Sequence, residues 1–215
     1  MICLYSCGDI EFVRFETAQP YGVKASESFN RKIKGEYINC SNPDDRLIIF
    51  NNLILNARTV KLKCHRTDLD FDSTIAVDKS TDEVLIDLFS MEGYKVNIMG
   101  DTINISQTNV DTVFWISENQ VLKKFKGSYF LNFKLDENFW DVTRLNLTKD
   151  TLLIGQISPS DTLLRFDFVE KTEDFNPSDS TTTTEYFIKP SKKEFKKLMK
   201  PNSFDACACY YKTNK

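Results

Sequence analysis

The chain has 215 residues, of which 41% are hydrophobic and 27% charged, and its formal net charge is −3. This is the composition of an ordinary globular protein with one domain, or with two small packed domains. Proteins that bind nucleic acid usually carry an excess of positive charge, whereas this chain is weakly negative, so no nucleic-acid partner is expected. No uninterrupted apolar run approaches the roughly 18 residues that a membrane-spanning helix needs.

The N-terminus contains the stretch Leu4-Tyr5-Ser6-Cys7-Gly8. This stretch resembles the cleavage end of a bacterial lipoprotein signal, in which the chain is cut before the cysteine and the cysteine is acylated. Residues 1–7 would then be the remnant of the signal, with Cys7 as the site of lipid attachment. A full signal also has a basic start and about 7–15 apolar residues, so we expect the true start further upstream. The alternative is an ordinary cytosolic N-terminus that happens to contain Cys7.

Residues 8–33 are polar and lack a clear period, which predicts an irregular tether and a docking segment. From residue 34 to 215 the apolar residues recur mostly with period two, which predicts a β-rich domain. The clearest strand, 59–64, alternates apolar with polar side chains as a half-buried strand does. Further strands are predicted at 35–40, 46–50, 52–56, 74–77, 112–117, 129–135, 139–147, 151–157, 164–168, 184–189 and 206–212.

The best-defined hairpin surrounds a two-residue turn at 100–101. With this turn, Ile98 pairs with Ile103 and Val96 pairs with Ile105. The register places all four apolar side chains on one face of the hairpin. We therefore expect that face to be buried.

Two segments have the apolar spacing of helices. Residues 82–92 carry apolar side chains three and four positions apart and stop at Gly93. Residues 192–199 follow Ser191, and Glu194 is placed to complete a capping box. Five lysines surround the apolar stripe of this second helix, which is expected to act as a lid on a sheet edge or barrel end. Contact with an anionic membrane or an acidic partner is the alternative.

A possible internal repeat and a polar stretch also bear on the predicted domain organisation. Lys34-Gly35-Glu36-Tyr37 recurs as Lys126-Gly127-Ser128-Tyr129, which predicts halves at 34–120 and 126–213. The alternative is two similar strand starts. Residues 171–185 are rich in threonine and acidic side chains, which predicts a long polar loop.

Four cysteines lie in the body of the chain: Cys40, Cys64, Cys207 and Cys209. The spacing favours reduced, buried cysteines, with one disulfide as the alternative. A zinc site is disfavoured because the chain has no C-x₂-C spacing and His65 is its sole histidine. His65 is expected to end a strand.

No motif assigns a catalytic residue, a metal ligand or a cofactor. The segment 68–72 begins like a calcium-binding loop, but Ser73 and Lys79 replace its glycine and glutamate, so an acidic surface turn is expected. Large aromatic residues such as Trp115 and Trp140 are usually core. Trp140, which follows a polar turn, is the candidate for a ligand-facing aromatic side chain.

An Asp-Ser or Asp-Thr pair followed by an apolar residue or threonine occurs six times, where composition predicts about one. The pattern is similar to the O-glycosylation acceptor of exported proteins in Bacteroidetes-type bacteria. The alternative is a turn that leads into a strand. Ser180, in the polar stretch, is the acceptor we predict.

Two ends of the chain share a further resemblance. The head Phe15-Glu16-Thr17-Ala18-Gln19-Pro20, followed by the Lys34-Gly35-Glu36-Tyr37 strand start, resembles the head of small lipoproteins from Bacteroidetes-type bacteria. The tail at 186–195 is similar to theirs. The resemblance implies a lipid-anchored protein of the cell envelope, at the outer membrane and facing the periplasm or the surface. It implies no activity.

These observations predict a mainly β (α+β) fold of antiparallel sheets, sandwich or barrel-like, with two short helices. The predicted function is a non-enzymatic module, held to the membrane by its lipid, that binds a protein or glycan. One alternative is a lipocalin-like carrier of a small apolar ligand, which needs a dry central cavity. The other is a carboxylate-based hydrolase, which needs two acidic residues in a cleft.

Overall fold

The computed structural model describes residues 10–65, 81–159, 161–176, 181–200 and 204–213. The strands are β1 (Ile10–Phe15), β2 (Gly35–Asn39), β3 (Asp45–Ile49), β4 (Leu53–His65), β5 (Lys95–Met99), β6 (Thr102–Trp115), β7 (Gln120–Phe125), β8 (Ser128–Lys134), β9 (Trp140–Thr148), β10 (Thr151–Ile157), β11 (Val169–Asn176), β12 (Thr181–Ile188) and β13 (Phe204–Lys212). The helices are α1 (Thr81–Met91), α2 (Lys192–Leu198) and the 3₁₀ helix η2 (Asp161–Arg165).

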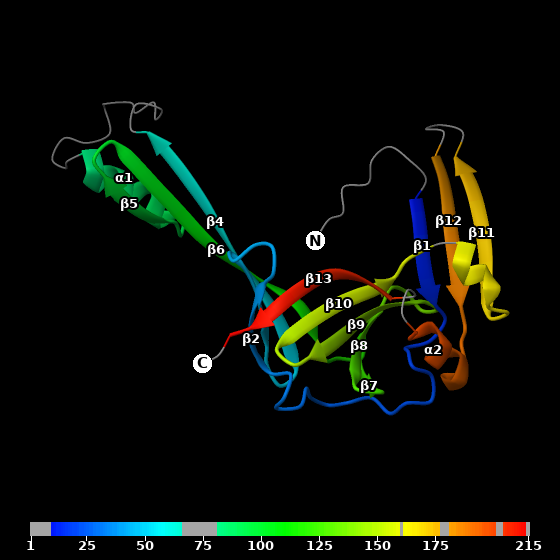
Figure 1. Ribbon diagram of the computed structural model, residues 1–215. Coiled ribbons are helices and arrows are strands. Elements are labelled where there is room, and N and C mark those ends of the chain that lie inside the picture. Colours follow the sequence, from blue (N-terminus) through cyan, green and yellow to red (C-terminus); the bar gives the residue numbers. More distant parts are fainter. Residues whose placement is uncertain (1–9, 66–80, 160, 177–180, 201–203, 214–215) are drawn as a thin grey trace.

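The predicted fold class is confirmed, because the chain is mostly strand with two α-helices in its described part. The strands form one sheet in the order β11-β12-β1-β9-β10-β13-β2-β3-β4-β6-β5, and β7 and β8 extend from β9. Neighbouring strands are antiparallel except β1 and β12, which are parallel. The sheet formed by the described strands is not closed into a barrel. Figure 1 shows a central body, a long arm made by β4, β5, β6 and α1, and a wing made by β1, β11 and β12.

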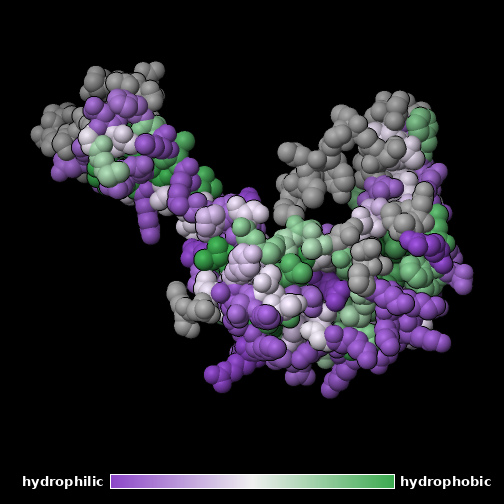
Figure 2. Space-filling view, viewed as in Figure 1, coloured by the Kyte–Doolittle hydropathy of each residue, from purple (hydrophilic) through white to green (hydrophobic). Residues whose placement is uncertain are grey.

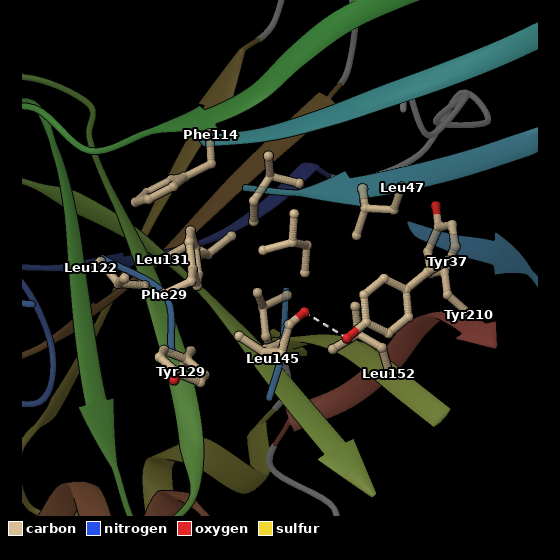
Figure 3. Close-up of a cluster of buried hydrophobic side chains, with 13 residues drawn as sticks. Phe29, Tyr37, Leu47, Phe114, Leu122, Tyr129, Leu131, Leu145, Leu152 and Tyr210 are labelled. Carbon is tan, nitrogen blue, oxygen red and sulfur yellow. Dashed lines mark hydrogen bonds between the residues drawn. The ribbon is translucent and has the colours of Figure 1, made fainter. Parts of the chain in front are cut away.

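The main core lies where the sheet curls back on itself. β2, β3, β4 and β6 face β7 to β10 and β13 across this cluster, as in a sandwich (Figure 3). Tyr37 and Phe114 reach it from one side, and Tyr129 and Leu145 from the other. The Tyr37 hydroxyl donates to the carbonyl of Ile33 at 2.6 Å, which satisfies the buried phenol.

A second core cluster joins the body to the wing and to α2. Phe195 and Leu198 of α2 are fully buried in it, and Phe195 packs against Phe130 of β8 with ring centroids 5.0 Å apart. The predicted capping box is confirmed, since Ser191 and Glu194 each accept a backbone N–H from the other. The helix therefore covers the core as a lid, and its lysines face solvent. Neither described α-helix has the length and apolar character to cross a membrane.

The arm is the part of the sheet that leaves the body. β4 and β6 pair over thirteen registered positions, and β5 adds to the far side of β6. The predicted hairpin is confirmed, with Ile98 opposite Ile103 and Val96 opposite Ile105. α1 covers this face, and its Leu85 is fully buried against the hairpin.

The predicted tether is wrong over Ile10–Phe15, which forms β1 and pairs with β12 along its whole length. Downstream of β1, Gln19 is fully buried. The side-chain amide of Asn132 accepts a hydrogen bond from the Gln19 backbone N–H and donates one to the Gln19 carbonyl. Lys123 donates to the carbonyls of Ala18 and Pro20 at 2.7 and 3.1 Å. Buried polar partners therefore hold the head motif in the fold.

Three further expectations need correction or limits. The predicted polar loop at 171–185 is largely paired in β11 and β12, because alternate side chains of β12 reach the second core. The predicted strand at 164–168 is instead the end of η2 and the bend that follows it. The predicted strand at 74–77 lies outside the described residues.

The cysteine prediction is wrong for one pair. Cys40, which follows β2, forms a disulfide with Cys209 of β13 across 169 residues of sequence. Cys64 is half-buried in the arm, and Cys207 sits at the bulge of β13 with its thiol directed to the Ile154 carbonyl. The sequence could not show this pairing because it depends on β13 lying beside β2.

Candidate functional site

The outer face of β3, β4 and β6 carries apolar side chains that no described element covers. Successive residues of a strand point to opposite faces, and directly opposite residues on paired strands share a face. Ile49, Ile54 and Phe114 point into the main core. The residues next to them in sequence therefore point outward.

Three of the outward side chains form a row across the sheet at the root of the arm. The Phe50 N–H donates to the Leu53 carbonyl at 2.9 Å, which closes the β3–β4 turn. Leu53 in turn lies opposite Trp115 on β6. Phe50 is 45% exposed and Trp115 is 58% exposed. Two large aromatic rings thus flank Leu53 on the solvent side.

The next positions along the arm continue this apolar surface. Ile48 lies opposite Leu55, and a bulge in β6 leaves Val113 exposed beside that pair. Val110, opposite Ala57, is more than half exposed. We call this surface the outer apolar face; it consists of Ile48, Phe50, Leu53, Leu55, Val110, Val113 and Trp115.

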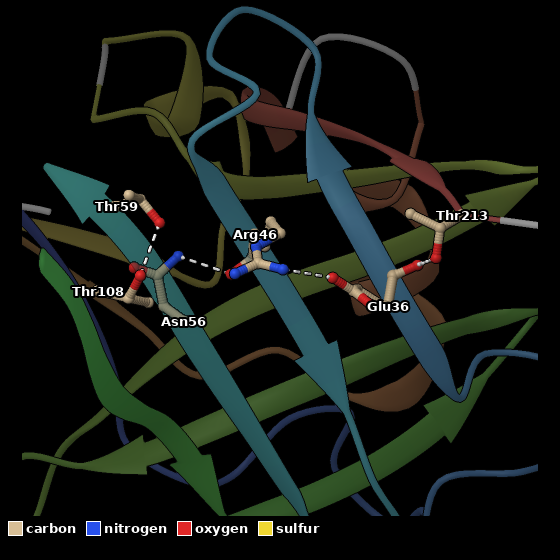
Figure 4. Close-up of polar contacts among 6 residues, drawn as sticks. All are labelled: Glu36, Arg46, Asn56, Thr59, Thr108 and Thr213. Atoms are coloured by element: carbon tan, nitrogen blue, oxygen red, sulfur yellow. Dashed lines mark hydrogen bonds and ion pairs between the residues drawn. The ribbon is translucent and has the colours of Figure 1, made fainter. Parts of the chain in front are cut away.

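Polar contacts border the outer apolar face on the side toward the arm tip. Arg46 lies in the same row as Val110 and pairs with Glu36 at 3.0 Å (Figure 4). In the next row, the hydroxyls of Thr59 and Thr108 are 2.9 Å apart (Figure 4). The positive charge of Arg46 is compensated by the negative charge of Glu36. The outer apolar face is therefore bordered on this side by polar groups with little net charge.

An open depression of about 440 Å³ adjoins the face at the β3–β4 turn. Lys34 closes one side by donating to the Asn51 side chain at 2.6 Å. The depression is lined by Lys34, Ile49, Phe50, Asn51, Asn52 and Leu53. This lining holds amide groups, one ammonium group and apolar side chains.

The buried polar groups of the body join strands to one another. Asp45 accepts hydrogen bonds from Asn39, Asn56 and the Tyr210 hydroxyl. Burial raises the pKa of Tyr210, and the nearby Asp45 carboxylate raises it further. Burial also raises the pKa of Asp141, against the effect of its hydrogen bonds. Within the described ranges, no three histidine, cysteine or acidic side chains come together as metal ligands.

The residues proposed from sequence have different outcomes. Cys7 and Ser180 lie outside the described residues. Trp140 begins β9 and is partly buried against the second core, away from the outer apolar face. The more exposed tryptophan is Trp115. The sequence did indicate an exposed aromatic residue here, because Phe114 and Trp115 are adjacent in one strand and only one of them can face the core.

Comparison with known proteins gives no further guide. The chain matches no family model, no curated protein and no solved structure.

Proposed function

We propose that the protein is a lipid-anchored protein of the bacterial cell envelope that binds another protein through the outer apolar face and catalyses no reaction. The exposed face itself is the observation that carries this proposal. Its four most exposed members, Phe50, Val110, Val113 and Trp115, are each at least 40% exposed, although they lie on or beside strands that are hydrogen-bonded into the sheet. Contiguous apolar surface of this kind marks interaction sites.

The chemistry of the face favours a protein partner over a glycan. Five of its seven side chains are aliphatic and offer no hydrogen bonds. A sugar needs polar partners beside the aromatic rings, whereas a protein interface has an apolar centre and a polar rim. Trp115 and Phe50 supply the aromatic residues that often anchor such interfaces, and Arg46 and Glu36 supply the rim.

The anchor rests on the sequence around Cys7. Two residues separate Cys7 from the first residue of β1, so acylation there would place the wing next to the membrane. Metabolic lipid labelling of the wild type and of Cys7→Ala in the native host tests this step. Label that is lost with Cys7→Ala supports the anchor, and surface proteolysis of the same cells then separates periplasmic from surface display. Absence of label in the wild type contradicts it.

The two alternative functions have less support. A lipocalin-like carrier needs a closed barrel with an empty centre, whereas this sheet is open and packed side chains fill its main core. A carboxylate-based hydrolase needs two acidic residues in a cleft. The depression beside Phe50 has no acidic residue in its lining.

Site-specific photo-crosslinking in the native host tests the binding surface. A photoreactive residue at Val113 should give a discrete protein adduct that disappears when Trp115→Ala is added. The matched control is the same residue at Phe175, which is 60% exposed on β11, far along the sheet. Equal adducts at both positions, or an adduct with a glycan alone, would contradict the proposal.

A further inference from the structure

The edge of β4 toward the arm tip has no neighbouring strand among the described residues. The last registered pair between β3 and β4 joins Asp45 to Arg58. β4 and β6 continue together for seven more pairs, from Thr59 to His65 on β4. No register shift and no proline interrupts this part of β4. This part of β4 is therefore an uninterrupted strand, and one of its sides has no described neighbour.

The backbone groups on the open side can be assigned from one hydrogen bond. The Thr59 N–H donates to the Asp44 carbonyl at 2.8 Å, so Thr59 directs its backbone groups toward the side of β3. These directions alternate along a strand. Lys61 and Lys63 therefore direct their N–H and C=O groups to the same side, where β3 has ended. Unpaired groups in this arrangement are a template for an added strand.

The side chains along this edge separate into two kinds. Val60 and Leu62 share one face and are 52% and 58% exposed. They continue the apolar surface beside α1, and Figure 2 shows hydrophobic residues along the side of the arm that β4 forms. Lys61 and Lys63 lie on the opposite face. An added strand would thus meet an apolar row on one face and a cationic row on the other.

The charges on the edge discriminate between partners. Lys61 pairs with Asp44, whereas Lys63 forms no ion pair with the residues that the structure describes. Antiparallel pairing with β4 of a second copy, centred on Lys61, Leu62 or Lys63, would place lysine opposite lysine. Like charges in opposite positions destabilise a sheet. The edge therefore disfavours a second copy and favours carboxylates.

We propose that this open edge of β4 binds an extended segment of a partner protein as an added β-strand, in which acidic residues alternate with apolar ones. The acidic residues lie opposite Lys61 and Lys63, and the apolar ones cover Val60 and Leu62. Backbone hydrogen bonds supply the docking, and the alternation supplies the specificity. This surface is separate from the outer apolar face.

A labelled peptide, Thr-Asp-Leu-Asp-Phe-Asp-Ser, is a suitable probe because it has this alternation. Fluorescence anisotropy with the full chain should show saturable binding that weakens with salt. The double change Lys61→Glu/Lys63→Glu should weaken binding about tenfold, because it replaces two favourable charge pairs with two pairs of like charges. The matched control is Lys95→Glu, on the same face of the sheet but on β5, at its far edge. It should change binding less than about twofold.

Backbone pairing needs its own readout. Hydrogen exchange at the amides of Lys61 and Lys63 should slow when the peptide binds. A peptide N-methylated at alternate residues keeps its charges but should bind much more weakly. No slowing of exchange, or equal binding of the methylated peptide, would leave only charge attraction and overturn the proposal. Trp115→Ala should bind the peptide normally, so failure here is distinct from failure of the proposed function.

One further outcome would also overturn the proposal. The probe sequence is that of residues 67–73 of this chain. If the peptide binds only after Asp68, Asp70 and Asp72 are replaced by asparagine, the edge is taken by the chain's own acidic segment. Binding that is unaffected by these replacements supports a site for an external strand.

Discussion

β8 and β6 belong to the same sheet, yet their surroundings differ. Among the described residues β8 pairs with β7 and β9 along most of its length, whereas β6 pairs with β5 only from Thr102 to Ser106 and beyond that with β4 alone. β8 is buried over its first five residues, because Tyr129 and Leu131 enter the main core while Phe130 enters the second. β6 is exposed over six successive residues, from Thr108 to Val113. Pairing alone therefore does not bury a strand. A strand is buried only on those faces where a second layer of the fold lies against it.

This difference separates stability from binding. The body has packed layers on both sides of β8, and truncation of its side chains should cost global stability. The arm has regular hydrogen bonding with little burial, which leaves its surface free to bind. Five changes test this division, in decreasing order of expected effect on stability.

Phe130→Ala should cost about 3–5 kcal/mol of unfolding free energy, as for other fully buried phenylalanines. Phe130 is fully buried, with ring centroids 5.0 Å from Phe195 and 6.0 Å from Phe204. Denaturant unfolding measures the loss. Phe175→Ala, at an exposed position on β11, serves as the control and should change stability by less than about 0.5 kcal/mol. Equal losses would mean that burial does not distinguish the two regions.

Cys40→Ser should cost about 2–5 kcal/mol, because the disulfide closes a loop of 169 residues in the unfolded chain. A reductant should lower the stability of the wild type by a similar amount and leave the variant unchanged. Cys64→Ser, in the arm, is the control for loss of a thiol. A wild type that is insensitive to reductant would contradict the Cys40–Cys209 pairing.

Tyr37 should give an alkaline loss of stability. Burial, with a contribution from the Asp150 charge, raises its pKa to about 12 from the usual 10. The folded state therefore favours the neutral phenol. The resulting stability is present below pH 10 and is lost as the pH rises to about 12, by about 2–3 kcal/mol. When the free energy of unfolding is measured against pH, the Tyr37→Phe variant should lack this alkaline loss of stability. If the variant keeps the loss, a group other than Tyr37 causes it.

Leu85→Ala should loosen the arm without loosening the body. Leu85 is fully buried between α1 and the β5–β6 hairpin in a cluster with few other buried members. Hydrogen exchange should accelerate in α1 and β5, while amides of β8 keep their protection. The midpoint of global unfolding should move little. Faster exchange throughout β8 would show that arm and body unfold together.

Trp115→Ala should have the smallest effect on stability, less than about 1 kcal/mol, since more than half of the side chain already meets solvent. The same variant should lose the crosslinked partner. A large destabilisation with normal crosslinking would reverse the roles that we assign to body and arm.

The sequence predicted local structure best where one face of an element is buried. The hairpin with its turn at 100–101 has the predicted register, and α2 begins at the predicted capping box. The sequence failed at β11 and at the start of β12, because polar side chains dominate that stretch, whereas the predicted strand at 184–189 covers the end of β12 with the buried Tyr186 and Ile188. It also failed at β1, whose partner β12 lies more than 160 residues away. Long-range pairing leaves little trace in local composition.

The sequence by itself determined the β-rich class, most strand positions and the two helices, because side-chain period and end caps act locally. Only the tertiary structure decided which faces of those strands are covered. Adjacent aromatic residues such as Phe114 and Trp115 show that one must point outward, but not which one. The layer that covers Phe114 comes from strands later in the chain, including β8 and its Tyr129. The surfaces available for binding, on the outer apolar face and along the edge of β4, follow from where that second layer ends.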